Sequence, residues 1–314
     1  MHLFNKNVLL AVLAVLTPFL LAQEGSPPTF SSNTQLVVLH ASVVDSKGHL
    51  LTTLKKEAFK VYEDKVEQPI KTFRREDVPV SLALIVDNSG SMRDKRRKVE
   101  AAALAMVKAS NPRDEVTIVN FNDEAYQDVL FTNDIKKMED GLTRIDSRGG
   151  TAMRDAISMT IDYIKDKGKH DKKVIVVVTD GDDNASTRVT LEKLVQKAHQ
   201  SEVLIYTIGL LNEEEKREAR KAKRALQALS EASGGLAVFP KEVSEVDKVA
   251  LEFATEIRNQ YIITYTPTNQ ALDGSFRTIK VAVSGPNKPV VRTRTGYYAK
   301  PAADKGQQVS KKNE

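Results

Sequence analysis

Four stretches in the middle of the chain consist almost entirely of apolar residues. They cover residues 80–86, 116–121, 174–179 and 203–208. Such runs, without polar alternation, are typical of strands that are buried on both faces. Apolar residues at helical spacing occur between and after them, at 99–106, 153–164, 191–198 and 243–257. The alternation of strands and helices predicts an α/β fold with a doubly wound, mostly parallel sheet covered on both sides.

Shorter strand patterns flank this middle part on both sides. Residues 35–44 and 59–62 precede it, and residues 261–266, 276–283 and 290–298 follow it, with turn residues between the strands. The strands of the first group are too few and too short to form a hydrophobic core by themselves. Because chain ends that leave one domain often lie close together, we expect the two groups to form one discontinuous β domain, a sandwich of the flanking N- and C-terminal strands.

The beginning of the chain has the pattern of a secretory signal peptide. Residues 1–7 carry one lysine and no acid, residues 8–21 are apolar except for Thr17 and Pro18, and Ala22 follows. A membrane anchor is the alternative, but a membrane-spanning helix needs about 20 apolar residues. We therefore expect cleavage after Ala22, a secreted or periplasmic protein, and no stable membrane span after cleavage.

Composition narrows the possible chemistry. Among 314 residues there is no cysteine, which excludes disulfide frameworks, zinc fingers, iron–sulfur clusters and cysteine nucleophiles. A metal site in this chain must therefore use oxygen or histidine, and the five histidines show no ligand spacing. The common nucleotide-binding, serine-hydrolase and zinc-protease motifs are also missing from the sequence, so we expect no enzymatic activity.

The excess of basic residues does not indicate a nucleic-acid partner. Lysine and arginine number 47 against 42 acids, which gives a formal charge of +5. They lie in segments of mixed sign, such as residues 95–100, and the chain contains no tryptophan to interleave with them. We interpret the 95–100 segment as a solvated helix face.

Oxygen-bearing side chains occur in three predicted loops, two of which follow strands and one of which precedes a helix. A D-x-S-x-S pattern follows the first apolar run, an aspartate follows the third run, and a threonine precedes the helical pattern at 153–164. The residues are Asp87, Ser89, Ser91, Thr151 and Asp180. Because loops at the carboxyl ends of strands converge where strand order reverses, these side chains are expected to share one crevice. Hard oxygen ligands suit Mg²⁺, Mn²⁺ or Ca²⁺, and a position left open on the ion would attract a carboxylate.

These residues resemble the metal-ion-dependent adhesion site of von Willebrand factor A domains. All five positions match that family's motif in order and spacing, and the resemblance covers about residues 79–258. The flanks are similar, more loosely, to bacterial exported proteins called VWFA-related domain proteins. The resemblance implies a Rossmann-like fold and a divalent cation, Mg²⁺ before Mn²⁺ or Ca²⁺. It also implies direct coordination by Ser89 and Ser91 and a protein partner that presents Asp or Glu to the metal, as in cell adhesion.

The expected organisation follows from these patterns. It comprises a signal peptide (1–22), a linker (23–32), a β segment (33–78), the VWFA domain (79–258), a second β segment (259–299) and a disordered tail (300–314). Two other functions remain open: an envelope scaffold or assembly protein with a structural metal site, and a metal-dependent hydrolase.

The residues directly after Asp180 are a separate case. Asp182 and Asp183 lie outside the five matching positions, and we interpret them as a solvated turn. A calcium loop of the EF-hand type is excluded here, because Ala185 and Leu191 stand where it needs Gly and Glu.

Overall fold

The computed structural model describes residues 36–109, 111–142, 147–211, 216–285 and 287–300. The expected signal peptide, the linker and the tail after Lys300 lie outside these residues. No helix in the described part of the chain is long and apolar enough to span a membrane.

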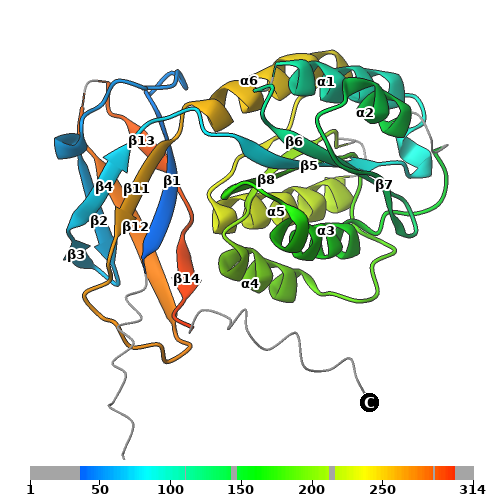
Figure 1. Ribbon diagram of the computed structural model, residues 1–314. Coiled ribbons are helices and arrows are strands. Elements are labelled where there is room, and N and C mark those ends of the chain that lie inside the picture. Colours follow the sequence, from blue (N-terminus) through cyan, green and yellow to red (C-terminus); the bar gives the residue numbers. More distant parts are fainter. Residues whose placement is uncertain (1–35, 110, 143–146, 212–215, 286, 301–314) are drawn as a thin grey trace, which may run out of the picture. The chain divides into compact units, whose positions relative to one another are not determined.

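A six-stranded sheet forms the centre of the fold (Figure 1). All neighbouring strands are parallel except the last pair, in which β7 runs antiparallel to β6. In spatial order the strands are β10 (Ala237–Val238), β9 (Leu204–Gly209), β8 (Lys172–Thr179), β5 (Val80–Asp87), β6 (Glu115–Phe121) and β7 (Ala125–Thr132). The predicted doubly wound, mostly parallel sheet is confirmed.

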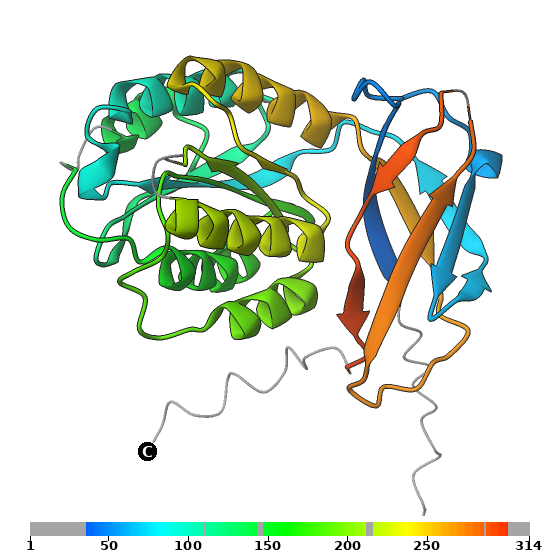
Figure 2. The same ribbon diagram turned by 180° about the vertical axis from the view of Figure 1, so that it is seen from behind.

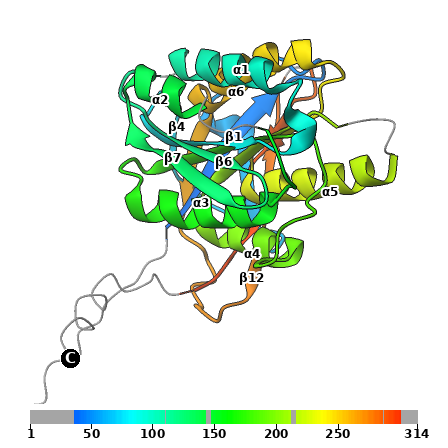
Figure 3. The same ribbon diagram turned by 90° about the vertical axis from the view of Figure 1, so that its right-hand side faces the viewer.

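Helices cover both faces of this sheet, as Figures 1 and 2 show from opposite sides. One face carries α1 (Arg96–Lys108), α2 (Ile135–Leu142) and α6 (Val246–Arg258). The other carries α3 (Met153–Lys167), α4 (Leu191–Ser201) and α5 (Lys216–Ser233). The turned view in Figure 3 shows the same layers, with the sheet between the two sets of helices.

The central strand β5 explains why the apolar runs are continuous. Leu82, Leu84 and Val86 pack in the core on the α1 and α6 side, whereas Ala83 and Ile85 pack in the core on the α3 side. Successive side chains of a strand point to opposite faces, so a strand covered on both faces needs apolar residues at every position. Burying a large aliphatic side chain contributes about 1.5–3 kcal/mol, so these buried strands stabilise the fold.

The flanking segments form two four-stranded sheets. One has the order β13 (Val290–Arg292), β1 (Val37–Val44), β11 (Tyr261–Tyr265) and β4 (Ile70–Arg74). The other has the order β14 (Gly296–Tyr298), β12 (Phe276–Val283), β2 (Phe59–Glu63) and β3 (Val66–Gln68). Each sheet combines strands from both ends of the chain and contributes to a shared apolar core. The expected discontinuous β domain is confirmed.

Some elements differ from the sequence-based expectation. The pattern at 290–298 is not one strand: β13 pairs with β1, whereas β14 pairs with β12 in the other sheet. The strands β3, β4 and β7 and the helix α2 were not predicted. In the part of the chain that the structure describes, short 3-10 helices lie at Lys56–Ala58, Gly90–Met92 and Val243–Glu245.

Candidate metal centre

The candidate site lies where the strand order reverses. The chain passes from β5 to β6 on one side and later adds β8 on the other side of β5. The loops that follow β5 and β8 therefore leave the carboxyl edge of the sheet side by side, which is where doubly wound sheets bind ligands. Two backbone hydrogen bonds join a third loop to the first: Gly90 N–H to Gly149 O (3.1 Å) and Arg148 N–H to Asn88 O (2.9 Å).

Asp87 ends β5 and is held from two sides. Its Oδ1 accepts a hydrogen bond from the Ser89 N–H (2.8 Å), and its Oδ2 accepts one from the Thr179 hydroxyl (2.5 Å). Burial raises the pKa of Asp87 to about 6, although the hydrogen bonds from Thr179 and Ser89 act in the opposite direction. Each Asp87 oxygen thus accepts a hydrogen bond from the protein, which fixes the carboxylate between the loop after β5 and the end of β8.

Ser89, Ser91 and Asp180 form a continuous chain of oxygens. The Ser89 and Ser91 hydroxyl oxygens lie 3.1 Å apart, and the Ser91 hydroxyl donates to Asp180 Oδ1 at 2.8 Å. Ser89 is 2% exposed and Asp180 is 6% exposed, whereas Ser91 between them lies at the surface, so the chain of oxygens runs from the interior to solvent. With the hydrogen bond from Ser89 to Asp87, the structure thus links four of the five predicted residues through direct contacts.

Thr151 lies at the start of α3, against the turn that follows β8. Its backbone N–H donates to Asn184 Oδ1 (2.8 Å), and its carbonyl accepts from the Asn184 and Ala185 N–H groups (both 3.2 Å). A methyl group on Gly181 would meet the Thr151 hydroxyl oxygen at 3.6 Å. The hydroxyl is therefore next to the residue that follows Asp180, which places the fifth predicted residue beside the same turn.

Lys95 was missed by the sequence interpretation. Its Nζ lies 2.6 Å from Asp180 Oδ2 and 3.4 Å from the Leu210 carbonyl oxygen. The interpretation of residues 95–100 as a solvated helix face is therefore wrong for Lys95, whose side chain is only 25% exposed. A lysine four positions after the D-x-S-x-S pattern was the available signal, but surrounding charges of both signs obscured it.

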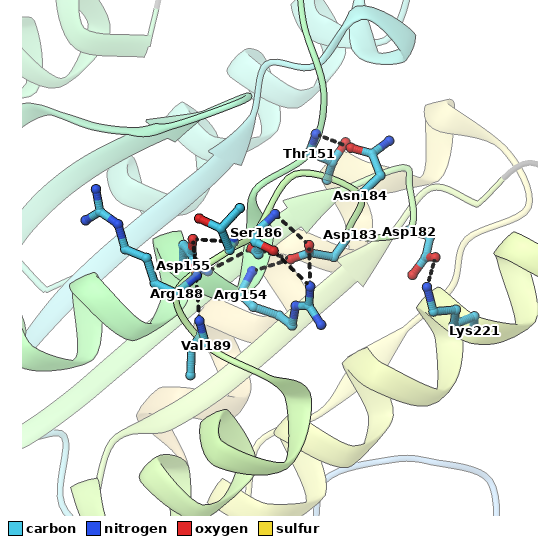
Figure 4. Close-up of polar contacts among 11 residues, drawn as sticks. Thr151, Arg154, Asp155, Asp182, Asp183, Asn184, Ser186, Arg188, Val189 and Lys221 are labelled. Carbon is cyan, nitrogen blue, oxygen red and sulfur yellow. Dashed lines mark hydrogen bonds and ion pairs between the residues drawn. The ribbon is translucent and has the colours of Figure 1, made fainter.

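The turn after Asp180 is fixed by polar contacts, which Figure 4 shows. Asp183 accepts hydrogen bonds from the Arg154 N–H (2.6 Å), the Arg154 guanidinium (3.0 Å) and the Ser186 hydroxyl (2.7 Å). Asp183 is only 8% exposed, so the expectation of a solvated turn is wrong for this residue. Asp182 forms an ion pair with Lys221 on α5 (2.6 Å). These contacts attach the β8 loop to α3 and α5.

The donor set fits a hard divalent cation. It consists of hydroxyl and carboxylate oxygens, which are the ligands that Mg²⁺ and related ions prefer. Among the described residues, no group of three or more His, Cys, Asp and Glu side chains is suited to a metal, so a site here must draw on the serine and threonine hydroxyls. The close Ser89–Ser91 contact and the Ser91–Asp180 hydrogen bond place such oxygens together.

Comparison with known proteins agrees with the fold and motif. Residues 82–182 match the family model of the von Willebrand factor type A domain. Over these residues the chain is similar to von Willebrand factor type A domains.

Individual relatives are distant. Calcium-activated chloride channel regulator 1 from Macaca mulatta is 28% identical over 168 residues, which are 51% of this chain and 17% of that protein. The Mus musculus protein of the same name is 27% identical over 172 residues, again 51% of this chain and 17% of that protein. The chain thus spans a small part of these relatives. A von Willebrand factor type A structure from Catenulispora acidiphila has a TM-score of 0.50 and 13% identity, and covers 85% of this chain and 75% of its own.

Proposed function

We propose that this protein is an exported, non-enzymatic module that binds an acidic group of a protein partner through a divalent cation. The proposed metal residues are Asp87, Ser89, Ser91, Thr151 and Asp180. The observation that carries the proposal is the oxygen chain of Ser89, Ser91 and Asp180 at the reversal of strand order. Mg²⁺ is the proposed ion because it prefers oxygen ligands and readily keeps waters in its remaining positions.

The residues have different proposed roles. Ser89 and Ser91 offer neutral hydroxyl oxygens, and Asp180 offers a carboxylate next to them. Asp87 holds the loop in place through the Ser89 N–H and the Thr179 hydroxyl. With hydroxyls instead of further carboxylates around it, a bound cation would keep positive charge with which to attract a partner's Asp or Glu.

The proposed organisation places this site in residues 79–258, with the β domain built from residues 33–78 and 259–299. A secreted or periplasmic location is proposed from the signal pattern at 1–22. Finding an intact Met1 on exported protein by mass spectrometry would contradict the proposed cleavage.

Calorimetry of the purified full chain with Mg²⁺ and with Mn²⁺ tests the metal site. We expect binding in the wild type, loss of binding in Asp87→Ala and Ser91→Ala, and no change in Asp182→Ala. Asp182 is a suitable control because it lies two residues from Asp180 but pairs with Lys221. Absence of binding by the wild type would contradict the proposal.

Affinity capture from an envelope extract tests the partner. We expect partners that are captured in Mg²⁺ to be released by EDTA and to be missing when Asp87→Ala is the bait. Capture that is unchanged in EDTA would instead favour a scaffold role for the β domain, with a structural metal site.

A further inference from the structure

Lys95 touches the proposed metal site without belonging to its five residues. It is the residue immediately before α1, and its side chain reaches across to the ends of β8 and β9. The Nζ lies 2.6 Å from Asp180 Oδ2, and the Ser91 hydroxyl donates to the other oxygen, Oδ1, at 2.8 Å. Both oxygens of Asp180 are therefore covered by donors from residues 91–95.

We infer that Lys95 competes with the divalent cation: its ammonium neutralises Asp180 when no ion is bound and releases that carboxylate when an ion binds. This inference rests on the proposed function, because it concerns the control of the same site. The two donors differ in a way that matters. The Ser91 hydroxyl also has lone pairs that it can offer to a metal, whereas an ammonium has three donors and no acceptor. When the cation binds, only Lys95 must therefore move away from Asp180.

Charge makes this competition substantial. A divalent ion and an ammonium that approach the same carboxylate repel each other, and at about 5 Å this repulsion weakens binding roughly tenfold even in a water-like dielectric. The Asp180 side chain is 1% exposed, so solvent contributes little screening on that side. Lys95 therefore lowers the affinity of the site for the ion while it keeps a buried carboxylate paired.

The surroundings of Lys95 provide a place for the displaced ammonium. The Leu210 carbonyl oxygen already lies 3.4 Å from Nζ, and the hydrogen bond from Leu210 N–H to Thr179 O (2.8 Å) fixes that carbonyl beside the end of β8. The Lys95 side chain is 25% exposed and has a flexible four-carbon stem. It can therefore leave Asp180 without losing every polar partner.

Titration of Mg²⁺ into the full chain, followed by calorimetry, measures the competition directly. We expect Lys95→Met to bind Mg²⁺ about tenfold more tightly than the wild type. Lys98→Met is the matched control, because it removes the same charge from an exposed position three residues further along and should leave the affinity unchanged. Lys95→Gln keeps a hydrogen-bond donor but removes the charge, so it should also bind more tightly, and it serves if Lys95→Met fails to fold.

Thermal unfolding provides a second, independent readout. In EDTA, Lys95→Met should melt below the wild type, because Asp180 is left as an unpaired buried carboxylate. In saturating Mg²⁺ this difference should disappear or reverse. A purely structural role for Lys95 predicts the same difference in both conditions and would overturn the inference.

The outcomes also separate this inference from the proposed function. If the wild type and the Lys95 variants bind Mg²⁺ equally, or if the variants bind more weakly, the competition is refuted and the metal site stands. If none of the folded proteins binds Mg²⁺ or Mn²⁺, both proposals fail. Detectable binding by the wild type together with tighter binding by the Lys95 variants supports both proposals.

Discussion

Buried charges gather at both ends of the central sheet, but they are held in different ways. At the amino end, Asp114 accepts hydrogen bonds from the Val80 N–H (2.8 Å) and the Asn111 N–H (3.1 Å) and pairs with Arg258. Glu115 next to it accepts from the Ser81 hydroxyl (2.8 Å). Backbone groups, a guanidinium and the Ser81 hydroxyl supply the donors, and they hold the edge of the sheet in place.

At the carboxyl end, hydroxyl oxygens stand next to carboxylates. Asp180 is paired with a partly exposed lysine, and Ser89 and Ser91 lie in contact beside it. Burial and charge therefore do not by themselves identify a binding site. What distinguishes the carboxyl end is that its oxygens can be offered to an ion by moving one flexible lysine side chain, whereas the amino end would have to lose backbone hydrogen bonds.

The largest expected effect concerns the amino end. Asp114→Ala should lower the free energy of unfolding by about 3–5 kcal/mol, because it leaves Arg258 without a buried partner, while Mg²⁺ affinity stays unchanged. Urea unfolding and calorimetry measure the two quantities. Asp77→Ala is the control: Asp77 pairs with the same arginine (2.8 Å) but its side chain is 51% exposed, so a loss below about 1 kcal/mol is expected. Loss of Mg²⁺ binding in folded Asp114→Ala would contradict the assignment of metal binding to the carboxyl end of the sheet alone.

Metal removal should act on the carboxyl end alone. At a free Mg²⁺ concentration of about 100 times the dissociation constant, the free energy of unfolding should exceed that in EDTA by about 2.7 kcal/mol. The difference should vanish in Asp87→Ala and persist in Asp114→Ala. Denaturant unfolding with and without EDTA measures it, and an equal stabilisation of Asp87→Ala would show that the ion binds elsewhere.

The amino end should instead respond to pH through Lys172. This lysine is 4% exposed and donates to the Ile257 carbonyl, and burial lowers its pKa from 10.5 to about 7. Above pH 7 the unfolded chain binds more protons than the folded protein, so stability rises with pH, by about 2 kcal/mol between pH 7 and 9. Lys172→Met should lack this part of the rise in urea unfolding at each pH. The same slope in both proteins would contradict the prediction.

The smallest expected effect concerns the ion pair that attaches the turn after Asp180 to α5. Lys221→Ala removes the ion pair between Lys221 and Asp182, in which the lysine side chain is 70% exposed. Such pairs contribute at most about 1 kcal/mol, so stability should fall slightly and Mg²⁺ affinity should stay unchanged. A clear change in affinity would mean that Asp182 acts on the ion, and calorimetry decides this.

Much of the fold could be predicted from the sequence because burial leaves a simple pattern. Strands β5, β6, β8 and β9 are covered on both faces and therefore show as apolar runs. Strand β7 forms the edge of the sheet and mixes exposed Tyr126 and Leu130 with buried Val129, so it shows neither a continuous run nor a clean alternation. It pairs with β6 as an antiparallel hairpin across residues 122–124.

The candidate site could be predicted only in part, for a related reason. The spacing after the strands indicated Asp87, Ser89, Ser91, Thr151 and Asp180, since carboxyl ends of parallel strands share one edge. The partner of Asp87 depends on strand register: Val86 pairs with Val178, which places Thr179 beside Asp87. Thr179 ends an apolar run, and Lys95 lies 85 residues from Asp180, so neither contact leaves a local signal.

The interleaving of β1 with β11 has a consequence for the order of folding. Leu54 and Tyr261, which are joined by a hydrogen bond, are 207 residues apart, and closing a loop of that length costs chain entropy. A folded central domain lowers this cost because Arg75 and Asn259, at its two chain crossings, are held together by a hydrogen bond (2.9 Å). Strands β1 and β4 therefore lack a partner until β11 has been synthesised, and unpaired strand edges of this kind are prone to aggregation.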